Sequence, residues 1–198
     1  MKKVPLIFIS YRRDDSSDVT GRIYDKLVNH FGKDAIFKDV DSIPFGVDFA
    51  RYIDRQVSKC NFCLVIIGDR WLEPRLKDLN DFVRIEVESA LKRNNVSVIP
   101  ILVRGSDIPQ SESLPESLKP LAGRNGIKVR HDPDFHNDMD RLINDIKKQI
   151  KYKNDSSNIN VLSNIKLNII LKTFTVGLFA VIVAFVSPKF GILLIQGN

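Results

Sequence analysis

Cysteine is scarce in this sequence. The chain of 198 residues has two, Cys60 and Cys63, in the stretch CNFC. Two thiols cannot supply the disulfide framework of a small secreted protein, and a zinc site would need a second pair of ligands that is absent. The pair leads into the apolar run FCLVIIG instead of opening a helix, so it lacks the helix N-terminus that activates thiols in redox motifs. We expect two buried structural cysteines and a reducing compartment.

Several nucleotide and hydrolase motifs are also missing. Neither a P-loop nor a G-x-G-x-x-G pattern is present, which excludes the standard phosphate cradles. The pattern G-x-S-x-G is absent too, and the three histidines, His30, His131 and His136, are not placed for a catalytic triad. We expect His30 on a helix surface. The start of the chain, MKKVPLIFISYRR, has too short an apolar run for a secretory signal peptide.

Charge is unevenly distributed. The net charge is +6, and hydrophobic residues make up 43% of the chain, which is enough for a real core. Six lysines lead into an apolar carboxy-terminal segment: Lys147, Lys148, Lys151, Lys153, Lys166 and Lys172. A basic patch can bind nucleic acid, but lysines beside a hydrophobic segment more often face an anionic membrane. We therefore favour a membrane partner and expect no nucleic acid.

Short apolar runs alternate with amphipathic stretches over residues 1–152. The runs predict strands at Val4–Ser10, Ala35–Asp39, Asn61–Gly68, Ser97–Val103 and Ile127–Arg130. Helical spacing predicts helices at Val19–Phe31 (capped by Ser16, Ser17 or Asp18), Val47–Cys60, Leu79–Arg93 (capped by Asn80 or Asp81) and about His136–Tyr152. Continuously apolar strands are buried on both faces. The sequence therefore predicts an α/β fold with a parallel sheet of about five strands and helices on both faces.

The carboxy-terminal part has a different composition. Residues 153–166 resemble a linker, and residues 167–195 form a hydrophobic segment. Its uncharged stretch, Thr173–Ser187, has 15 residues, short of the roughly 20 that span a bilayer. Lys172 or Lys189 at its ends could snorkel to the interface. Because the stretch is apolar on every side and lysine is denser before it than after it, we expect a single transmembrane helix with the first domain in the cytoplasm.

Ligands of parallel sheets bind at the carboxyl ends of the strands, so the loops there form the candidate site. The first loop reads SYRRDDSS, the second KDVDSIPFGVDF and the third GDRWLEP. The turn Pro44-Phe45-Gly46 can project an exposed aromatic side chain. The charges and hydroxyls of the first loop fit either an ordinary solvated loop or the wall of a pocket for a charged ligand.

Two glutamates of the third predicted helix have contrasting neighbours. Glu88 has basic residues four positions before and after it, so it belongs to a solvated ion-pair face. Glu86 has Phe82 and Ala90 at those positions, which puts its carboxylate on or beside the apolar stripe, where it is costly unless paired or used. A rim glutamate that reaches water or an arginine is an equal alternative. One such carboxylate near arginines, hydroxyls and aromatic rings suits cleavage of a bond to a good leaving group through an oxocarbenium-like state.

Five motifs in order, FISYRRDDS, FKDVDSIPFGVDF, LVIIGDRW, VRIEVESAL and VIPILV, resemble the TIR domain family, especially its bacterial members. The resemblance covers about Lys3–Lys151 and implies a flavodoxin-like sheet, with the family's mobile BB loop at DVDSIPFG. Many TIR domains are NAD⁺ hydrolases or cyclases that release nicotinamide, and others are signalling scaffolds without activity.

The resemblance also implies roles for particular residues. FVRIEV is similar to the family pattern W-V-x-x-E-[IV], which places the catalytic role on Glu86, with Phe82 in place of the usual tryptophan. By position, substrate-binding residues of the family correspond to Ser10, Tyr11, Arg12, Arg13, Asp39, Asp41, Ser42, Ile43, Phe45 and Trp71. For Trp71, a packing role explains the position equally well.

For the whole chain, the resemblance implies an NAD⁺ hydrolase whose TIR domains self-associate, with NAD⁺ as the substrate and no metal or other cofactor. Together with the predicted transmembrane helix, this gives a membrane-anchored enzyme. Its role would be antiviral defence, through depletion of NAD⁺ or a cyclic ADP-ribose signal. Two other interpretations stay open. One is a non-catalytic adaptor that acts through TIR–TIR contacts, and the other is an effector whose hydrophobic segment perturbs the bilayer.

Overall fold

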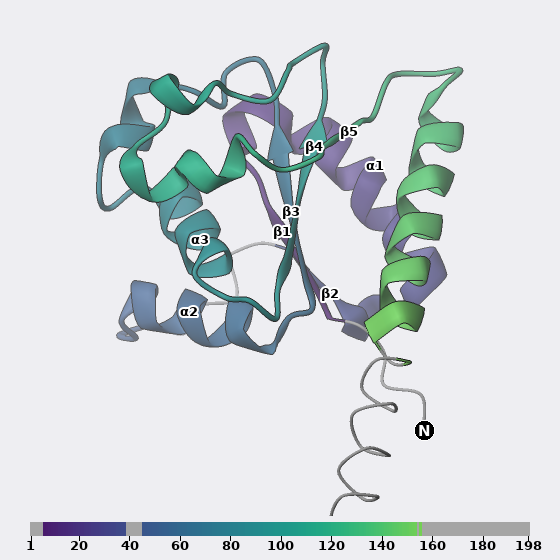
Figure 1. Ribbon diagram of the computed structural model, residues 1–198, viewed down its shortest axis with the longest axis horizontal. Helices are drawn as coiled ribbons and strands as arrows, with labels where there is room; N and C mark the ends of the chain where they lie inside the picture. Colours follow the sequence, from purple (N-terminus) through teal and green to yellow (C-terminus); the bar gives the residue numbers. More distant parts are fainter. Residues whose placement is uncertain (1–5, 39–44, 154, 156–198) are drawn as a thin grey trace, which may run out of the picture. The chain divides into compact units, whose positions relative to one another are not determined.

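Five parallel strands form the centre of the protein (Figure 1). The computed structural model describes residues 6–38, 45–153 and 155. The strands lie side by side in the order β2-β1-β3-β4-β5, and every neighbouring pair is parallel. This is the flavodoxin-like order, so the predicted sheet is confirmed. The strands are β1 (Ile7–Ser10), β2 (Ile36–Lys38), β3 (Phe62–Ile67), β4 (Ser97–Leu102) and β5 (Ile127–Lys128).

The two central strands, β1 and β3, are buried at every position. Ile7 of β1 pairs with Ile36 of β2 on one side and with Phe62 of β3 on the other. Helices cover both faces of the sheet, so side chains pointing either way must be apolar. Ser10, the polar residue at the carboxyl end of β1, is fully buried as well.

Two helices cover each face of the sheet. Helix α1 (Arg13–Phe31) and the helical residues 135–147 lie on one face, and α2 (Phe49–Lys59) and α3 (Phe82–Leu91) lie on the other (Figure 1). On the first face, Lys26 pairs with Asp140 at 3.3 Å. On the second, the rings of Phe49 and Phe82 stack with their centroids 4.0 Å apart. The arrangement agrees with the sequence prediction.

Short 3-10 helices fill the longer connections. They are η1 (Lys33–Ala35), η3 (Pro74–Lys77), η4 (Ser111–Ser113) and η5 (Glu116–Leu121). The segment with η4 and η5 joins β4 to β5 and packs Leu114, Leu118 and Leu121 into the core that surrounds α3. This connection, which contains Pro109, Pro115 and Pro120, is therefore a packed part of the fold.

Helix α1 begins six residues earlier than predicted, at Arg13 instead of Val19. A kink at Ser16, whose φ and ψ are −141° and 20°, separates a first turn from the regular helix. Ser16, one of the predicted cap residues, therefore stands directly before the regular helix, whereas Arg12, the N-cap residue of the first turn, makes no side-chain cap bond. The acidic side chain of Asp15 in the first turn accepts backbone hydrogen bonds from the loop after β3, which explains why helix forms there. In α3 the prediction is confirmed, because Asp81 accepts a hydrogen bond from the backbone N–H of Arg84.

The chain divides into a compact unit that ends at Lys147 and a second unit from Lys148 onward. Within the described residues, the helices are too short or too polar to span a bilayer. The predicted transmembrane segment, residues 167–195, lies outside the described residues.

Candidate active site

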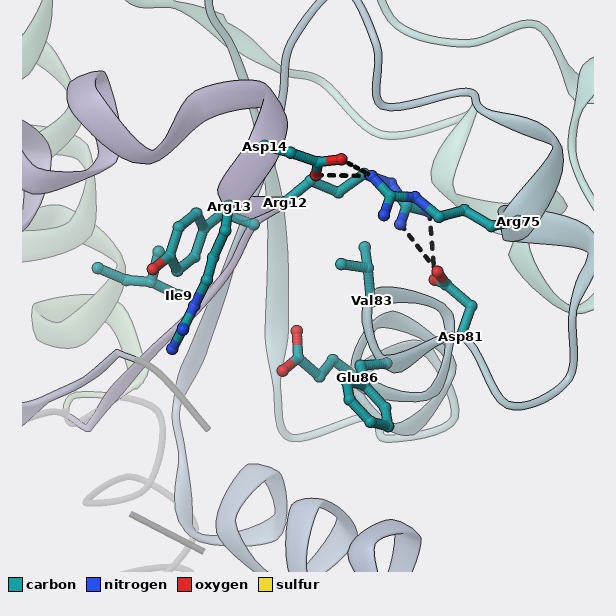
Figure 2. Close-up of a pocket in the computed structure, with 10 residues that line it drawn as sticks. Ile9, Arg12, Arg13, Asp14, Arg75, Asp81, Val83 and Glu86 are labelled. Atoms are coloured by element: carbon teal, nitrogen blue, oxygen red, sulfur yellow. Dashed lines mark hydrogen bonds and ion pairs between the residues drawn. The ribbon is translucent and has the colours of Figure 1, made fainter. Parts of the chain in front are cut away.

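The order in which the chain adds strands to the sheet reverses between β1 and β3. The chain runs from β1 to β2 on one side and then crosses to β3 on the other. Because β1 and β3 are parallel, the loops that follow them leave the same edge of the sheet. Open parallel sheets bind ligands at such a switch point. A cavity of about 210 Å³ opens there (Figure 2). It is lined by Ile9, Tyr11, Arg12, Arg13, Asp14, Arg75, Asp81, Phe82, Val83 and Glu86.

The carboxylate of Glu86 belongs to this cavity. It comes from the second turn of α3, on the face that carries the buried residues Val83 and Val87. The hydroxyl of Ser10, at the end of β1, donates a hydrogen bond to Glu86 Oε2 at 2.6 Å. Glu86 is only 4% exposed. The sequence prediction that this glutamate lies beside the apolar stripe is confirmed, and the Ser10 hydroxyl orients a carboxylate that also lines the cavity.

Glu88 has the environment expected of a structural ion pair. It pairs with Arg84 at 2.7 Å and with Lys92 at 3.7 Å, and the hydroxyl of Ser117 donates a hydrogen bond to it at 2.5 Å. Burial alone would raise the pKa of Glu88, but the hydrogen bonds from Ser117 and Arg84 outweigh burial and hold the pKa below its usual value. The predicted contrast between the two glutamates is therefore confirmed.

Arg12 joins three elements beneath the cavity. Its Nε donates to the carbonyl oxygen of Trp71 at 3.1 Å, and its two terminal nitrogens donate to the carboxylate of Asp81 at 2.8 and 3.2 Å. Arg12 is 4% exposed. The same carboxylate caps α3, so one buried guanidinium ties the end of β1 to the loop after β3 and to the start of the helix that carries Glu86.

Asp15 makes a second link between the loops. Its carboxylate accepts hydrogen bonds from the backbone N–H groups of Gly68 at 3.1 Å and Arg70 at 3.0 Å. A Cβ atom on residue 68 would lie 2.3 Å from Asp15 Oδ2, so the carboxylate can approach only because residue 68 is glycine. Burial raises the pKa of Asp15 and the nearby Asp69 raises it further, against the opposing effect of the two backbone donors.

Tyr11 and Arg13 line the cavity, as the sequence predicts for the first loop. Tyr11 is half-buried, and Arg13 is exposed. In Figure 2, Arg13 extends down one side of the cavity, opposite Val83 and Asp81. The two adjacent arginines therefore have different surroundings, since Arg12 is buried in a salt bridge.

The second loop is only partly described. Asp39, Asp41, Ser42 and Ile43 lie outside the described residues. Phe45 is fully exposed, as expected for the Pro-Phe-Gly turn, and it is not among the described residues that line the cavity.

Trp71 is fully buried and packs in the hydrophobic core with Leu76 and Val87. Among the described residues that line the cavity, its side chain does not appear. Of the two roles that the sequence leaves open for Trp71, the packing role is the one that this structure displays, together with the carbonyl bond to Arg12.

Sequence reasoning missed several lining residues, above all Asp14, Arg75 and Asp81. Asp81 was predicted only as a cap, and Arg75 belongs to the stretch EPRLKD, which carries no motif. The usable signal for Asp14 was its position directly after the two arginines at the end of a parallel strand. Phe82 lines the cavity and is 55% exposed.

Both cysteines are buried, as predicted. Burial raises the pKa of Cys60 to about 12 and raises the pKa of Cys63 well above its usual value, so neither is an activated thiol. Over residues 6–38, 45–153 and 155, no group of three or more His, Cys, Asp or Glu side chains is arranged to hold a metal ion.

Comparison with known proteins finds a matching family and several relatives. Residues 7–143 match the description "TIR domain". Over 135 residues the chain is 30% identical to "NAD(+) hydrolase sarm1" of Drosophila melanogaster, a match that covers 67% of this chain and 10% of the relative. The chain thus spans about a tenth of the length of that relative.

Solved structures resemble the chain as well, including the following two. The TIR domains of the activated Roq1 resistosome, which directly recognises the pathogen effector XopQ, match with a TM-score of 0.56 and 13% identity over 71% of this chain and 98% of theirs. A metazoan TIR-STING receptor from C. gigas, in complex with 2',3'-cGAMP, matches with a TM-score of 0.48 and 19% identity over 70% of this chain and 41% of its own. The likeness to the Roq1 domains shows that the fold is shared.

Proposed function

The chain belongs to the TIR domain family, and from this premise we propose that it cleaves the bond between nicotinamide and ribose in NAD⁺, with Glu86 as the catalytic residue. The observation that carries the proposal is the buried hydrogen bond between Ser10 and Glu86 at a cavity on the switch point of the sheet. The name of the Drosophila relative, an NAD(+) hydrolase, supports the same reaction.

The proposed reaction needs charge stabilisation more than strong acid–base catalysis. The carbon–nitrogen bond breaks with both electrons going to the ring nitrogen of nicotinamide, which leaves as a neutral molecule. The ribose carbon acquires positive charge, and the negative carboxylate of Glu86 stabilises it in a site where water screens little. Water then attacks this carbon and loses a proton, which gives ADP-ribose. Attack by a nitrogen of the same molecule's adenine gives cyclic ADP-ribose instead.

Substitution of the carboxylate tests the assignment. Glu86→Gln keeps the shape of the side chain and removes its charge, so nicotinamide release should fall by about 100-fold or more. The matched control is Glu88→Gln, the same change two residues along the same helix, which should leave most of the activity. Nicotinamide release from NAD⁺ by clustered protein is the measurement.

Two results would count against the proposal. Wild-type rates in the Glu86→Gln variant would remove Glu86 from the catalytic role. No nicotinamide release at all by clustered wild-type protein would favour a non-catalytic TIR scaffold. The fully exposed ring of Phe45, with the exposed Val47 beside it, supports that second function, because an exposed apolar patch suits protein–protein contact.

Self-association is compatible with the catalytic proposal too. In the catalytic proposal, the first and second loops position the dinucleotide. The first loop contributes Tyr11 and Arg13, and the second contributes Asp39, Asp41, Ser42, Ile43 and Phe45. TIR–TIR contacts then switch activity on, and confinement of copies to a membrane plane raises their effective concentration. The structural neighbour from a resistosome is consistent with TIR–TIR assembly. We extend the proposal to antiviral defence through loss of NAD⁺ or a cyclic ADP-ribose signal.

The membrane part of the proposal rests on the composition of residues 167–195 and the lysines before them. It places the TIR domain on the cytoplasmic side, joined to a single membrane helix by residues 153–166. Truncation after Asn164 should move the protein from the membrane fraction to the soluble fraction. If the truncated chain still sediments with membranes, residues 167–195 are not the membrane anchor.

A further inference from the structure

Among the described residues, three arginines line the cavity, namely Arg12, Arg13 and Arg75. We propose that Arg75 binds the diphosphate of the dinucleotide, and that Asp14 occupies this arginine until the substrate displaces it. The inference rests on the proposed NAD⁺ function for the identity of the ligand. It assigns to Arg75 a role in substrate binding that no motif of the sequence indicates, and to Asp14 the role of a competing partner.

Arg12 is not available for this role. Its guanidinium donates to the Asp81 carboxylate and the Trp71 carbonyl, and the side chains of the Arg12–Asp81 pair are 3% and 7% exposed. Pulling one partner out of a buried pair leaves an uncompensated charge, which is strongly unfavourable. A ligand phosphate would have to overcome that penalty before it gained anything from Arg12.

Arg75 has a partner that can be exchanged. Its Nη2 donates to Asp14 Oδ1 at 2.6 Å, and its Nε lies 3.1 Å from Glu73 Oε2. The side chains of Arg75 and Asp14 are 43% and 49% exposed. Exposed ion pairs contribute little net free energy, whereas a guanidinium binds a phosphate through two parallel hydrogen bonds. Exchange of the Asp14 carboxylate for a phosphate therefore replaces a weak interaction with a stronger one of the same kind.

The position of the pair suits the shape of the substrate. Arg75 comes from η3, in the connection between β3 and α3, and Asp14 comes from the first turn of α1. Figure 2 shows the Asp14–Arg75 pair at one end of the cavity and the Glu86 carboxylate toward the other, with Val83 between them. In NAD⁺ one ribose ring separates the scissile bond from the diphosphate. A ligand whose ribose lies at Glu86 can therefore extend its diphosphate toward Arg75.

Titration of the full-length chain with ADP-ribose tests the inference without requiring any cleavage. Arg75→Ala should weaken binding of ADP-ribose about tenfold or more. Arg75→Lys should recover part of the loss, because lysine keeps the positive charge but lacks the planar guanidinium that makes two parallel hydrogen bonds. Asp14→Asn should tighten binding by about two- to fivefold, since it removes the competing carboxylate. In the double variant Asp14→Asn/Arg75→Ala this gain should disappear.

A matched control is available outside the cavity. Asp18 pairs with Arg104 at 2.7 Å, and the two side chains are 64% and 37% exposed. Asp18→Asn breaks an equivalent ion pair on the same helix and should leave binding of ADP-ribose unchanged. Adenosine, which lacks the diphosphate, should bind all variants with the same affinity as the wild type.

The outcomes separate this inference from the proposed function. Unchanged ADP-ribose affinity in Arg75→Ala, or a gain from Asp14→Asn that persists in the double variant, overturns the inference even where NAD⁺ is cleaved. ADP-ribose binding that depends on Arg75 supports the inference even where wild-type protein cleaves no NAD⁺. With an active enzyme, the substitutions at both positions should change KM for NAD⁺ and leave kcat within about twofold, because Arg75 lies away from the reacting carbon. A fall in kcat with unchanged KM would overturn the inference.

Discussion

Two arginine–aspartate pairs border the same cavity and differ in burial. The inner pair, Arg12–Asp81, has side chains that are 3% and 7% exposed. The outer pair, Arg75–Asp14, has side chains that are 43% and 49% exposed. Both are direct contacts of charged groups, with nitrogen–oxygen distances of 2.8 Å and 2.5 Å.

The comparison shows how burial changes what an ion pair does. The inner pair cannot lose a partner without leaving a buried charge, so it holds the ends of β1, the loop after β3 and the start of α3 together. The outer pair is screened by water and contributes little to stability. Its arginine therefore remains open to exchange, which is the property that a binding residue needs.

Removal of Asp81 should have the largest effect on stability. Asp81→Ala leaves the Arg12 guanidinium buried without its carboxylate, at a cost of about 3–5 kcal/mol, and removes the cap of α3, at a further cost of about 1 kcal/mol. Asp14→Ala, the same change in the outer pair, should cost less than about 1 kcal/mol. Chemical denaturation gives the free energy of unfolding of each variant.

The double variant Arg12→Met/Asp81→Ala sharpens this test. It removes both buried charges, so it should be more stable than Asp81→Ala alone, although it lacks the same cap. If the double variant is no more stable than Asp81→Ala, the buried charge is not the cause of the loss. Equal losses from Asp81→Ala and Asp14→Ala would remove the distinction between the inner and outer pairs.

A smaller effect concerns the pH dependence of two adjacent carboxylates. The hydrogen bond from Arg75 lowers the pKa of Asp14 below its ordinary value of 3.8, and burial raises the pKa of Asp15 above it. The stabilisation from Asp14 is present above the ordinary value and is lost as pH falls through the lowered pKa. The stabilisation from Asp15 is present below the ordinary pKa and is lost as pH rises through the raised pKa.

The pKa values of both carboxyl groups can be measured from their NMR chemical shifts in an acid titration. Asp14 should titrate at lower pH than Asp15. In Arg75→Ala, the pKa of Asp14 should move up toward its ordinary value while that of Asp15 stays in place. Titration of the two groups at the same pH in the wild type would contradict the exposed and buried environments assigned to them.

Much of the fold could be predicted from the sequence because the pattern is local. The continuous apolar runs of β1 and β3 reflect burial on both faces, and each predicted strand is present within a few residues. The Glu86 and Glu88 contrast was also predictable, since helical spacing alone puts one glutamate beside the buried residues and the other among basic side chains. The cap at Asp81 follows from its position before an apolar helix.

The start of α1 and the surroundings of Trp71 depend on distant parts of the chain. Asp15 stabilises the early turn of α1 through backbone donors more than 50 residues away, at Gly68 and Arg70. No local pattern distinguishes a tryptophan that lines a pocket from one that packs in the core. In the structure, Trp71 belongs to the same hydrophobic core as Leu114 and Leu118 of the segment after β4.

The sequence by itself determined the parallel α/β architecture and the glutamate that belongs beside the core, because both follow from the spacing of apolar residues within single elements. Only the tertiary structure decided the roles of the arginines. Arg12 and Arg13 are adjacent and chemically identical, yet Arg12 is buried against Asp81 and Arg13 is exposed. Burial depends on which remote elements surround a side chain, and the partner of Arg12 lies 69 residues away along the chain.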